Sequence, residues 1–466
     1  MTEVKEQVQA SQGRYQPYPR YKASKVEGLS EVPEHWQEPT RIKFESSLKG
    51  RLGWQGLKAS EYRDEGPHVV SSAHFRNCVI EWERCPRVSM ERYNLDSNIQ
   101  LQEGDILLMK DGAAMGKMAF VDSLPGPSCL NSHLLLFRPL VADGAEPTYA
   151  PKFLFYFLLT ELFQGFIKVN GTGATFLGIS QQAIGNYSFY LPPYDEQRTI
   201  AAFLDYETAR IDDLIAKQQR LIELLKEKRQ AVISHVVTKG LNPDAPMKDS
   251  GVEWLGQVPE HWQISQPRYL CRFMGGGTPS KDKSSYWGGD IPWVSPKDMK
   301  REVIAESIDS ITMDAVRESS TKLIPTGSVL IVVRGMILAH SVPVAITSKP
   351  VTINQDMKAL VCGDNVDGEY LLMCLQGLKQ PVLDLVDSSA HGTKCLRTDQ
   401  FETLPTPLPP RAEQKEIVAK VKGITLSIDQ TIAAANHSIS LSNERRTALI
   451  SAAVTGKIDL REWKRP

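Results

Sequence analysis

Two stretches of this 466-residue chain are rich in lysine and arginine, side chains that can neutralise phosphate groups. Residues 41–63 carry six basic and two acidic side chains, and residues 264–301 carry seven and three, so each has a local net charge of +4. A single such stretch would most simply be a solvated surface. Both follow the same pentapeptide, VPEHW, and this recurrence favours contact with a phosphate-bearing ligand, although the net charge of the chain is only −1.

Two other segments resemble catalytic motifs but lack residues that the chemistry requires. LPPY at 191–194 resembles the [DNS]PP[YFW] motif of adenine methyltransferases, but its leucine cannot accept a hydrogen bond from a target amino group. GAAMGKM at 112–118 resembles a phosphate-binding loop, but only three residues separate its glycines and Met118 stands where Ser or Thr would hold magnesium. We therefore expect no enzyme, although carboxylate nuclease sites have no fixed spacing that the sequence could exclude.

The cysteines and histidines give no sign of a metal site or a disulfide framework. The seven cysteines are scattered without a C-x-x-C pair, and the nine histidines lie apart. This usage is typical of a reducing compartment. The densest apolar stretch, residues 153–159, is far shorter than a membrane span, and the N-terminus has no apolar run of signal-peptide type. The sequence predicts a cytoplasmic protein with no membrane partner.

The chain contains an internal repeat that positions these segments. KASKVEGLSEVPEHWQ at 22–37 returns as KDSGVEWLGQVPEHWQ at 248–263, and LPPYDEQRTIAAFL at 191–204 returns as LPPRAEQKEIVAKV at 408–421. The offset between copies is 226 at VPEHW, about 223 where GDILLMKDG (104–112) meets GSVLIVVRG (327–335), and 217 from LPP onward. Such a period is too long for a solenoid, so each copy is a domain with its connector.

The constant offset after LPP indicates a pair of long helices. Residues 196–237 contain neither proline nor glycine, and apolar residues recur at three- and four-residue spacing. A helix of about 42 residues would be about 63 Å long. The narrow apolar seams predict that the two helices lie antiparallel as a coiled coil. The seam positions are Ile200, Leu204, Ile211, Leu214, Leu221, Leu225 and Val232, and in the second copy Ile417, Val421, Ile424, Ile428, Ala435, Ile439 and Leu449.

Each copy also contains a globular part of about 150 residues. Strand-like runs stand at 104–112, 133–140, 327–335 and 342–347, and one helical stretch per copy stands at 150–168 and 367–387. A Gly/Thr-rich loop follows each helical stretch, at 171–176 and 391–395. We expect a mixed α/β (α+β) fold with two globular domains, two long antiparallel helices and a pseudo-twofold internal repeat.

These repeated motifs together resemble the DNA-specificity subunit (HsdS) of type I restriction-modification systems, and the likeness covers nearly the whole chain. The signatures that carry it are PEHW (33–36 and 259–262), GGGTPS with YWGGDIPWVSPKDM (275–299), GD-x-L with DG-x-x-x-GK (104–117), RG (334–335), NQDM (354–357), and LPP-x-x-EQ (191–197 and 408–414). The doubled PEHW with the doubled LPP-x-x-EQ makes the resemblance specific. The first copy lacks the GGGTPS segment, which implies that its domain reads a different sequence.

The resemblance implies a domain order and a set of partners. It implies an N-terminal segment (1–30), a first target recognition domain (31–193), a central helical spacer (194–241), a linker (242–256), a second target recognition domain (257–410) and a C-terminal helical spacer (411–457). It further implies a split, asymmetric target in double-stranded DNA, with two methyltransferase subunits on the helices and restriction or translocase subunits joining through that complex. No cofactor is expected on this chain, because S-adenosylmethionine, ATP and magnesium would belong to the partner subunits.

The residues expected to contact DNA come from the basic stretches and the signature loops. They are Arg51, Lys58, Lys110 and Lys117 in the first domain, and Thr278, Ser280, Lys281, Lys283, Tyr286, Trp287, Lys297, Arg334, Gln355 and Lys394 in the second. Lysine and arginine would neutralise phosphates, and Arg, Lys and Gln would also reach base edges. The alternative is an assembly scaffold that uses duplicated domains around a coiled coil without binding DNA.

Overall fold

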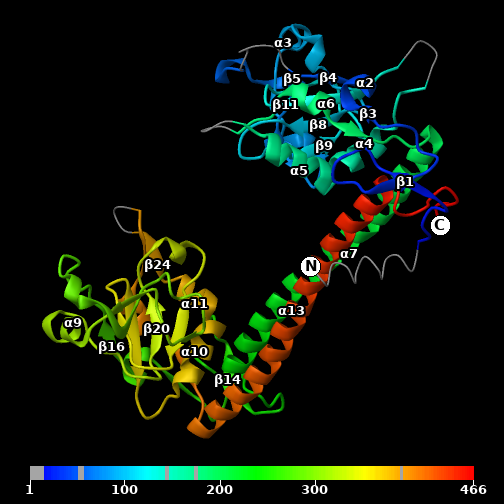
Figure 1. Ribbon diagram of the computed structural model, residues 1–466. Coiled ribbons are helices and arrows are strands. Elements are labelled where there is room, and N and C mark those ends of the chain that lie inside the picture. Colours follow the sequence, from blue (N-terminus) through cyan, green and yellow to red (C-terminus); the bar gives the residue numbers. More distant parts are fainter. Residues whose placement is uncertain (1–14, 51–56, 142–145, 173–176, 389–391) are drawn as a thin grey trace. The chain divides into compact units, whose positions relative to one another are not determined.

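The computed structural model describes residues 15–50, 57–141, 146–172, 177–388 and 392–466 (Figure 1). The chain forms two compact units: unit 1 is Met1–Lys217 with His437–Pro466, and unit 2 is Gln218–Asn436. The long helices α7 (Tyr194–Lys239) and α13 (Arg411–Val454) each contribute residues to both units. Each globular domain therefore folds together with one part of each helix.

Unit 1 is built on a four-stranded antiparallel sheet in the order β4-β11-β8-β9. Its strands are β4 (Ser46–Lys49), β11 (Leu134–Pro139), β8 (Ile106–Met109) and β9 (Met118–Phe120). The other strands of unit 1 are β1 (Tyr21–Ala23), β2 (Glu31–Pro33), β3 (Thr40–Arg41), β5 (Arg63–Val70), β6 (Phe75–Arg76), β7 (Val79–Ile80), β10 (Ser128–Leu130) and β12 (Ser188–Phe189). Its shorter helices are α2 (Ile42–Glu45), α3 (Met90–Asn94), α4 (Pro151–Leu158), α5 (Glu161–Asn170) and α6 (Gln181–Asn186), with 3-10 turns η1 (Ala59–Glu61), η2 (Ser72–His74), η3 (Trp82–Arg84) and η4 (Ser97–Ile99).

Unit 2 repeats this strand order and adds one parallel edge strand, giving β16-β23-β20-β21-β18. Its strands are β16 (Cys271–Gly275), β23 (Met357–Cys362), β20 (Val329–Val332), β21 (Val344–Thr347) and β18 (Val303–Ile304). The other strands of unit 2 are β13 (Met247–Asp249), β14 (Gln257–Pro259), β15 (Gln263–Ser265), β17 (Trp287–Val294), β19 (Asp309–Ile311), β22 (Thr352–Ile353), β24 (Val386–Ser388), β25 (Lys394–Leu396) and β26 (Thr406–Leu408). Its shorter helices are α8 (Pro267–Leu270), α9 (Met313–Glu318), α10 (Gly368–Gly377), α11 (Lys379–Leu383) and α12 (Thr398–Glu402), with 3-10 turns η5 (Ser284–Tyr286) and η6 (Met336–Ala339).

The predicted strands and the predicted fold class are confirmed, but the single helical stretch expected in each copy is wrong. In unit 1 the stretch is α4 and α5, which break at Thr160, whose hydroxyl donates to Phe157 O at 2.6 Å. Such a bond competes with the helical backbone pattern. In unit 2 it is α10 and α11, because Pro381 has no N–H to continue the ladder of α10.

The segments expected to precede and connect the domains also carry structure. In the first copy β1 pairs with β2 in antiparallel register, Lys22 opposite Val32. In the second copy β13, within the expected linker, pairs with β14 in the same way, Lys248 opposite Val258. The repeat therefore begins with a short hairpin that leads into PEHW in each unit.

The core of each unit extends onto the long helices. In unit 1 the buried core joins the sheet and α4 to Ile200, Phe203 and Leu204 of α7 and to Leu449 and Ala453 of α13. In unit 2 the core joins the sheet and α10 to the end of α7 and the start of α13. The unit 2 helix residues in this core are Ile233, Val236, Val237, Ile417, Val418 and Val421. Each domain thus buries the start of one helix and the end of the other.

The two helices are antiparallel within each unit, and their ion pairs follow the repeat. In unit 1 Arg446 Nη1 lies 2.9 Å from Asp212 Oδ1, and in unit 2 Arg229 Nε lies 3.4 Å from Asp429 Oδ1. Adding the repeat offset of 217 to Asp212 and Arg229 gives Asp429 and Arg446. The same ion pair is therefore formed twice, as the predicted pseudo-twofold repeat requires.

The predicted seam is only partly buried. Ile200, Leu204 and Ile211 are buried, whereas Leu214 and Leu221 are 44% and 39% exposed, and Ile222 is buried in place of its neighbour Leu221.

Among the described residues, no helix has the length and apolarity needed to cross a membrane.

Candidate nucleic-acid interface

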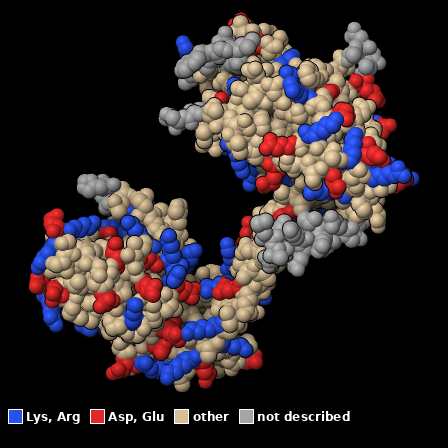
Figure 2. Space-filling view, viewed as in Figure 1, with Lys and Arg blue, Asp and Glu red and all other residues tan. Residues whose placement is uncertain are grey.

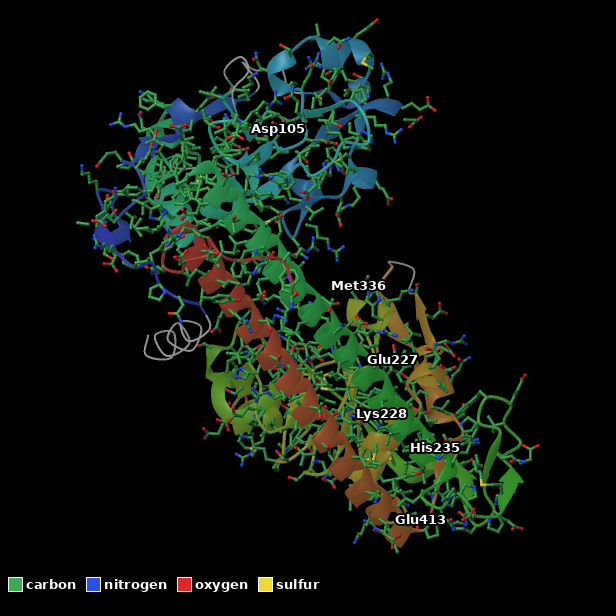
Figure 3. All side chains as sticks on the ribbon, turned by 90° about the vertical axis from the view of Figure 1, so that its right-hand side faces the viewer. Asp105, Glu227, Lys228, His235, Met336 and Glu413 are labelled. Atoms are coloured by element: carbon green, nitrogen blue, oxygen red, sulfur yellow. The ribbon has the colours of Figure 1, made fainter. Side chains whose placement is uncertain are left out.

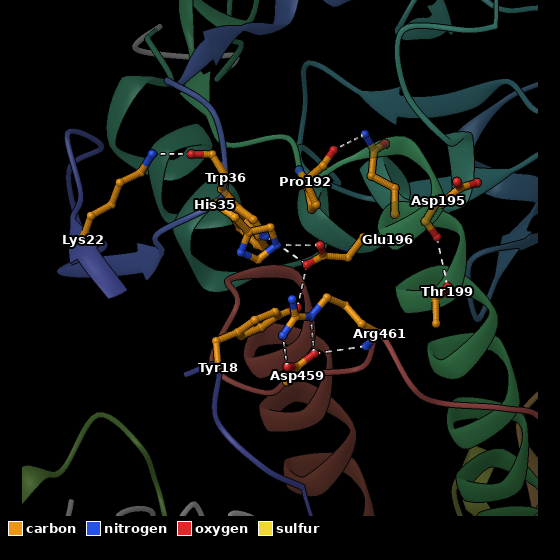
Figure 4. A network of polar contacts seen from close by, with 11 residues as sticks. Tyr18, Lys22, His35, Trp36, Pro192, Asp195, Glu196, Thr199, Asp459 and Arg461 are labelled. Atoms are coloured by element: carbon orange, nitrogen blue, oxygen red, sulfur yellow. Dashed lines mark hydrogen bonds and ion pairs between the residues drawn. The ribbon is translucent and has the colours of Figure 1, made fainter. Parts of the chain in front are cut away.

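In unit 1 the PEHW and EQ motifs meet at the buried carboxylate of Glu196, in the first turn of α7 (Figure 4). Trp36 Nε1 donates to Oε1 at 2.9 Å, and His35 Nε2 lies 2.7 Å from Oε2. Tyr18 donates its hydroxyl to Oε1 at 2.6 Å. Burial, together with this bond, raises the pKa of Tyr18, so the hydroxyl remains a donor. The start of the globular domain is thereby fixed to the start of α7.

Unit 2 builds the same contact on Glu413, in the first turn of α13 (Figure 3). Trp262 Nε1 donates to Glu413 Oε1 at 3.1 Å, and His261 Nε2 lies 2.8 Å from Oε2. Gly240, directly after the end of α7, packs against the same tryptophan: a Cβ added there would lie 3.3 Å from the Trp262 ring. Its φ of +79° also favours glycine. The doubled PEHW and EQ motifs therefore join each domain to the start of one long helix, and in unit 2 the same tryptophan also contacts the end of the other.

The glutamine of each EQ motif positions a short helix of the globular domain in its own unit. Gln197 Oε1 accepts from Ala150 N at 2.9 Å, and Ala150 is the N-cap of α4. Gln414 Oε1 accepts from Asp367 N at 2.8 Å, and Asp367 is the N-cap of α10. Each glutamine also donates from Nε2 to a proline carbonyl of the LPP segment before it. These residues are structural supports, which leaves the loops at the sheet as candidates for recognition.

In unit 2 the signature loops meet beyond the end of β20. Val333 N donates to Asp356 O at 2.8 Å, Gly335 N donates to Lys394 O at 3.0 Å, and Leu396 N donates to Val333 O at 2.9 Å. These bonds join the RG turn, the NQDM turn and β25. We call this set the loop frame of unit 2; it comprises residues 333–335, 356 and 394–396.

Four of the predicted residues gather around this frame. Arg334 is exposed, and its backbone forms an isolated antiparallel β-bridge with that of Cys395. Lys394 donates from Nζ to Ser388 Oγ at 2.7 Å. The hydroxyl of Thr278 donates to Oε1 of Gln355, which lies in the NQDM turn. The structure thus brings Thr278, Arg334, Gln355 and Lys394 from four separate segments to one end of the sheet.

Unit 1 builds the same frame after β8. Lys110 N donates to His133 O at 3.1 Å, Gly112 N donates to Leu177 O at 2.7 Å, and Ile179 N donates to Lys110 O at 2.8 Å. Lys110 therefore lies in the frame. The loop frame of unit 1 comprises residues 110–112, 133 and 177–179.

Three predicted residues of unit 2, Lys283, Tyr286 and Trp287, form contacts within the domain. Tyr286 is buried at 7% exposure, and Lys283 Nζ lies 2.6 Å from Glu318 Oε2 and 2.9 Å from the Tyr286 hydroxyl. The bond to Glu318 raises the pKa of Lys283, and the same bond lowers the pKa of Glu318. Trp287 donates from Nε1 to Ser280 O at 3.1 Å and meets the Trp293 ring edge-on. These side chains support the GGGTPS loop from within.

The remaining predicted residues lie on the surface or outside the described part. Ser280, Lys281 and Lys297 are exposed in unit 2. Lys58 and Lys117 are exposed in unit 1, where Lys117 donates from Nζ to Ser72 O at 2.9 Å. Arg51 lies outside the described residues, as do residues 173–176 and 389–391 of the two Gly/Thr loops.

Sequence reasoning missed Asp111 and His133 in the frame of unit 1. Their side chains are in hydrogen-bond contact, with His133 Nδ1 2.6 Å from Asp111 Oδ1. The offset of 223 that relates GDILLMKDG to GSVLIVVRG makes Asp111 the repeat equivalent of Arg334, and His133 the repeat equivalent of Asp356. That offset was available from the sequence, but a carboxylate was not expected among DNA-facing residues.

Comparison with known proteins identifies the family. Residues 58–224 and 259–436 match the type I restriction modification DNA specificity domain, which thus occurs twice and covers most of the chain. The chain belongs to the type I DNA specificity family. Within this family it is 37% identical over 174 residues to the EcoR124I/EcoR124II specificity subunit of Escherichia coli, covering 37% of this chain and 40% of that protein. It is 31% identical over 168 residues to the MjaIX specificity subunit of Methanocaldococcus jannaschii, covering 35% and 38%.

The chain thus spans less than half of the length of these two type I specificity subunits. It spans 95% of the putative MjaX specificity subunit of Methanocaldococcus jannaschii, which covers 92% of this chain at 23% identity. The fold is similar to a chain from a structural study of complex assembly and conformational transition of the type I R-M system, with a TM-score of 0.70 at 16% identity, covering 92% of this chain and 99% of that one. It is also similar to the HsdS subunit from Thermoanaerobacter tengcongensis, with a TM-score of 0.53 at 17% identity, covering 93% and 100%.

Proposed function

We propose that this chain is the sequence-reading subunit of a type I restriction-modification complex. It binds double-stranded DNA at a split, asymmetric target, and each globular domain reads one part. The observation that carries the proposal is the loop frame, which is built twice on the same backbone hydrogen bonds but bears different side chains. A duplicated backbone with unlike side chains suits two readers of two different sequences.

The surface chemistry supports a DNA ligand. Lys281 is exposed directly after the GGGTPS loop, Lys297 is exposed within the WVSPKDM segment, and Arg334 is exposed in the loop frame of unit 2. On the face that Figure 2 shows, lysine and arginine side chains lie among acidic ones on both units. Affinity would therefore come from local phosphate contacts, and specificity from base-edge contacts of the frame side chains.

The long helices offer a surface for protein partners. In unit 2 the two helices form a groove lined by both polar and apolar residues, and Leu224 and Leu426 are 45% and 60% exposed on these helices. Exposed leucines at such positions suit a protein interface. We place two methyltransferase subunits here, with restriction or translocase subunits joining through them. S-adenosylmethionine, ATP and magnesium would be bound by those partners, and this chain would be non-catalytic.

The length of the helices would set the gap between the two parts of the target. Half-sites about one helical turn of DNA apart, roughly 34 Å, present their major grooves on one face of the duplex. A continuous helix of 46 residues (α7) is long enough to bridge such a separation, since each residue adds about 1.5 Å.

An electrophoretic mobility assay tests the proposal against the scaffold alternative. The chain, assembled with its modification subunit, is expected to retard duplex DNA with one preferred bipartite sequence, and the retardation is expected to weaken as salt rises. A scaffold that does not bind DNA would show no sequence preference at any salt concentration, and that result would overturn the proposal.

A further inference from the structure

The two loop frames are equivalent bond by bond. The bonds Lys110 N to His133 O and Gly112 N to Leu177 O in unit 1 have counterparts at Val333 N to Asp356 O and Gly335 N to Lys394 O in unit 2. The third bond of each frame also corresponds, and so do the bridges of the central residue, Asp111 with Gly178 and Arg334 with Cys395. All of these pairs follow the offsets 223 and 217 of the repeat.

The equivalent central side chains carry opposite charges. Arg334 is exposed, and a guanidinium only donates hydrogen bonds. Asp111 is partly exposed at 23% of its side chain, and an ionised carboxylate only accepts hydrogen bonds. The same backbone position therefore offers donors in one domain and acceptors in the other.

A carboxylate beside DNA narrows the roles available to Asp111. It repels phosphate oxygens, so it cannot serve as a backbone contact. It can accept a hydrogen bond from a base amino group in the major groove, and acidic side chains pair in this way with N4 of cytosine. His133, half exposed and 2.6 Å away, holds the Asp111 carboxylate in place.

We infer that Asp111 and Arg334 are equivalent specificity-determining residues, with Asp111 reading a cytosine in one part of the target and Arg334 reading a guanine in the other. Arg334 would donate to O6 and N7 of guanine, the pairing that best fits an arginine fork. His133 is a positioning residue for Asp111. This inference rests on the proposed function and deepens it, because it names the position in each domain at which the two readers diverge.

The test uses the full chain assembled with its modification subunit and measures affinity for duplexes that carry single base-pair changes in the wild-type target. The wild-type complex should lose roughly 5- to 150-fold in affinity when the guanine read by Arg334 or the cytosine read by Asp111 is replaced. The Arg334→Gln variant should abolish this discrimination at one base pair of one half-site only. The Asp111→Asn variant, which preserves shape but replaces one acceptor oxygen by a donor, should abolish it at one base pair of the other half-site only.

The exposed Arg317, on α9 and outside the loop frame, provides a matched control. Arg317→Gln should leave the preference unchanged at every base pair. If Arg334→Gln and Asp111→Asn weaken all duplexes equally and leave each preference intact, both residues act without reading bases and the inference is overturned. A wild-type complex with no preferred sequence would instead overturn the proposed function, so the two failures are distinguishable.

Discussion

At the scale of single residues, the two equivalent carboxylates Glu196 and Glu413 should differ in their contribution to stability, and Glu196 should contribute more. Its side chain is 5% exposed and meets three polar groups of the first domain, whereas the equivalent Glu413 is 23% exposed. Removing a carboxylate that partners buried donors leaves those donors unsatisfied, and the loss is larger where water cannot replace it. The two copies of one motif should therefore differ in what they contribute to stability.

We expect Glu196→Ala to destabilise the protein by about 2–4 kcal/mol, because the buried Trp36 indole and the Tyr18 hydroxyl lose their acceptor. Glu413→Ala should cost less. Urea unfolding followed by tryptophan fluorescence measures both changes. Glu223→Ala, which removes a 64%-exposed glutamate of α7, is the control and should change the free energy of unfolding by less than about 0.5 kcal/mol. Equal losses at Glu196 and Glu413 would contradict the account.

A buried ion pair in unit 1 gives a second prediction. Asp105 is fully buried and receives two bonds from Arg138, both at 2.7 Å (Asp105 is labelled in Figure 3). Asp105→Ala leaves a partly buried guanidinium without its partner and should cost about 3–5 kcal/mol. Thermal unfolding measures the loss; a change below about 1 kcal/mol would mean that water replaces the carboxylate.

The lysines beside the GGGTPS loop should differ in their contribution to DNA binding. Lys283 is held by Glu318, and its raised pKa and the lowered pKa of Glu318 mean that the pair stays charged throughout the neutral range. The pairing is lost only as pH falls through the lowered value of Glu318 or rises through the raised value of Lys283. Lys281 is exposed.

Lys281→Ala should therefore reduce the magnitude of the negative slope of log affinity against log salt by about one, and Lys283→Ala should leave this magnitude nearly unchanged at pH 7. Fluorescence anisotropy with labelled duplex over a range of salt concentrations gives both slopes. Glu318→Gln serves as the companion variant, since it releases Lys283 and should increase the magnitude of the slope. A slope magnitude that falls equally in both lysine variants would show that the ion pair opens on DNA.

At the scale of elements, the helices and sheets were largely predictable, whereas the loop contacts were not. The apolar runs around Ile106 and Val329 predict buried strands, and the proline-free stretch after Pro193 predicts α7, because periodicity and helix-breaking residues act locally. The break at Thr160 was not predictable, because it depends on a side chain bond made only in the folded helix.

The site residues divide in the same way. Arg334, Gln355 and Lys394 were predicted as site residues from the signatures of their loops, and the structure brings those loops together. Their contact with DNA stays a prediction. Tyr286 was expected to contact DNA, and aromatic side chains can stack on bases, but tertiary packing buries it. Residue type and spacing predict which loops meet; only the fold decides which side of a loop faces outward.

The helices also give a prediction about the length of the DNA target. Each unit contains its own part of both helices, with division at Lys217 in α7 and at Asn436 in α13. Inserting four helix-forming residues after both positions adds about 6 Å and leaves the ion pairs within each unit intact. We expect the gap in the target to lengthen by about one to two base pairs, at 3.4 Å each, with both half-sites unchanged.

The map of methylated sites in cells that carry the variant measures the gap. An insertion into α7 alone is the comparison: it shifts one helix against the other, so it should lower the melting temperature and abolish methylation. A normal map with the original gap after the double insertion would contradict a spacing role for the helices.

At the scale of the whole molecule, the internal repeat would explain how one chain could serve the asymmetric target that we propose. The helix ion pairs, the PEHW contacts and the loop frames all occur twice, whereas the frame side chains differ between Asp111 and Arg334. The support is thus repeated and the chemistry presented to a ligand is not. A symmetric dimer of one such domain would read the same sequence twice.

Sequencing of the methylated sites in cells that carry this chain with its modification partner tests the central claim most directly. The account predicts a single motif of two unlike specified parts separated by a fixed unspecified gap, present only when this chain is expressed. A continuous motif, two identical half-sites, or methylation that does not depend on this chain would contradict it.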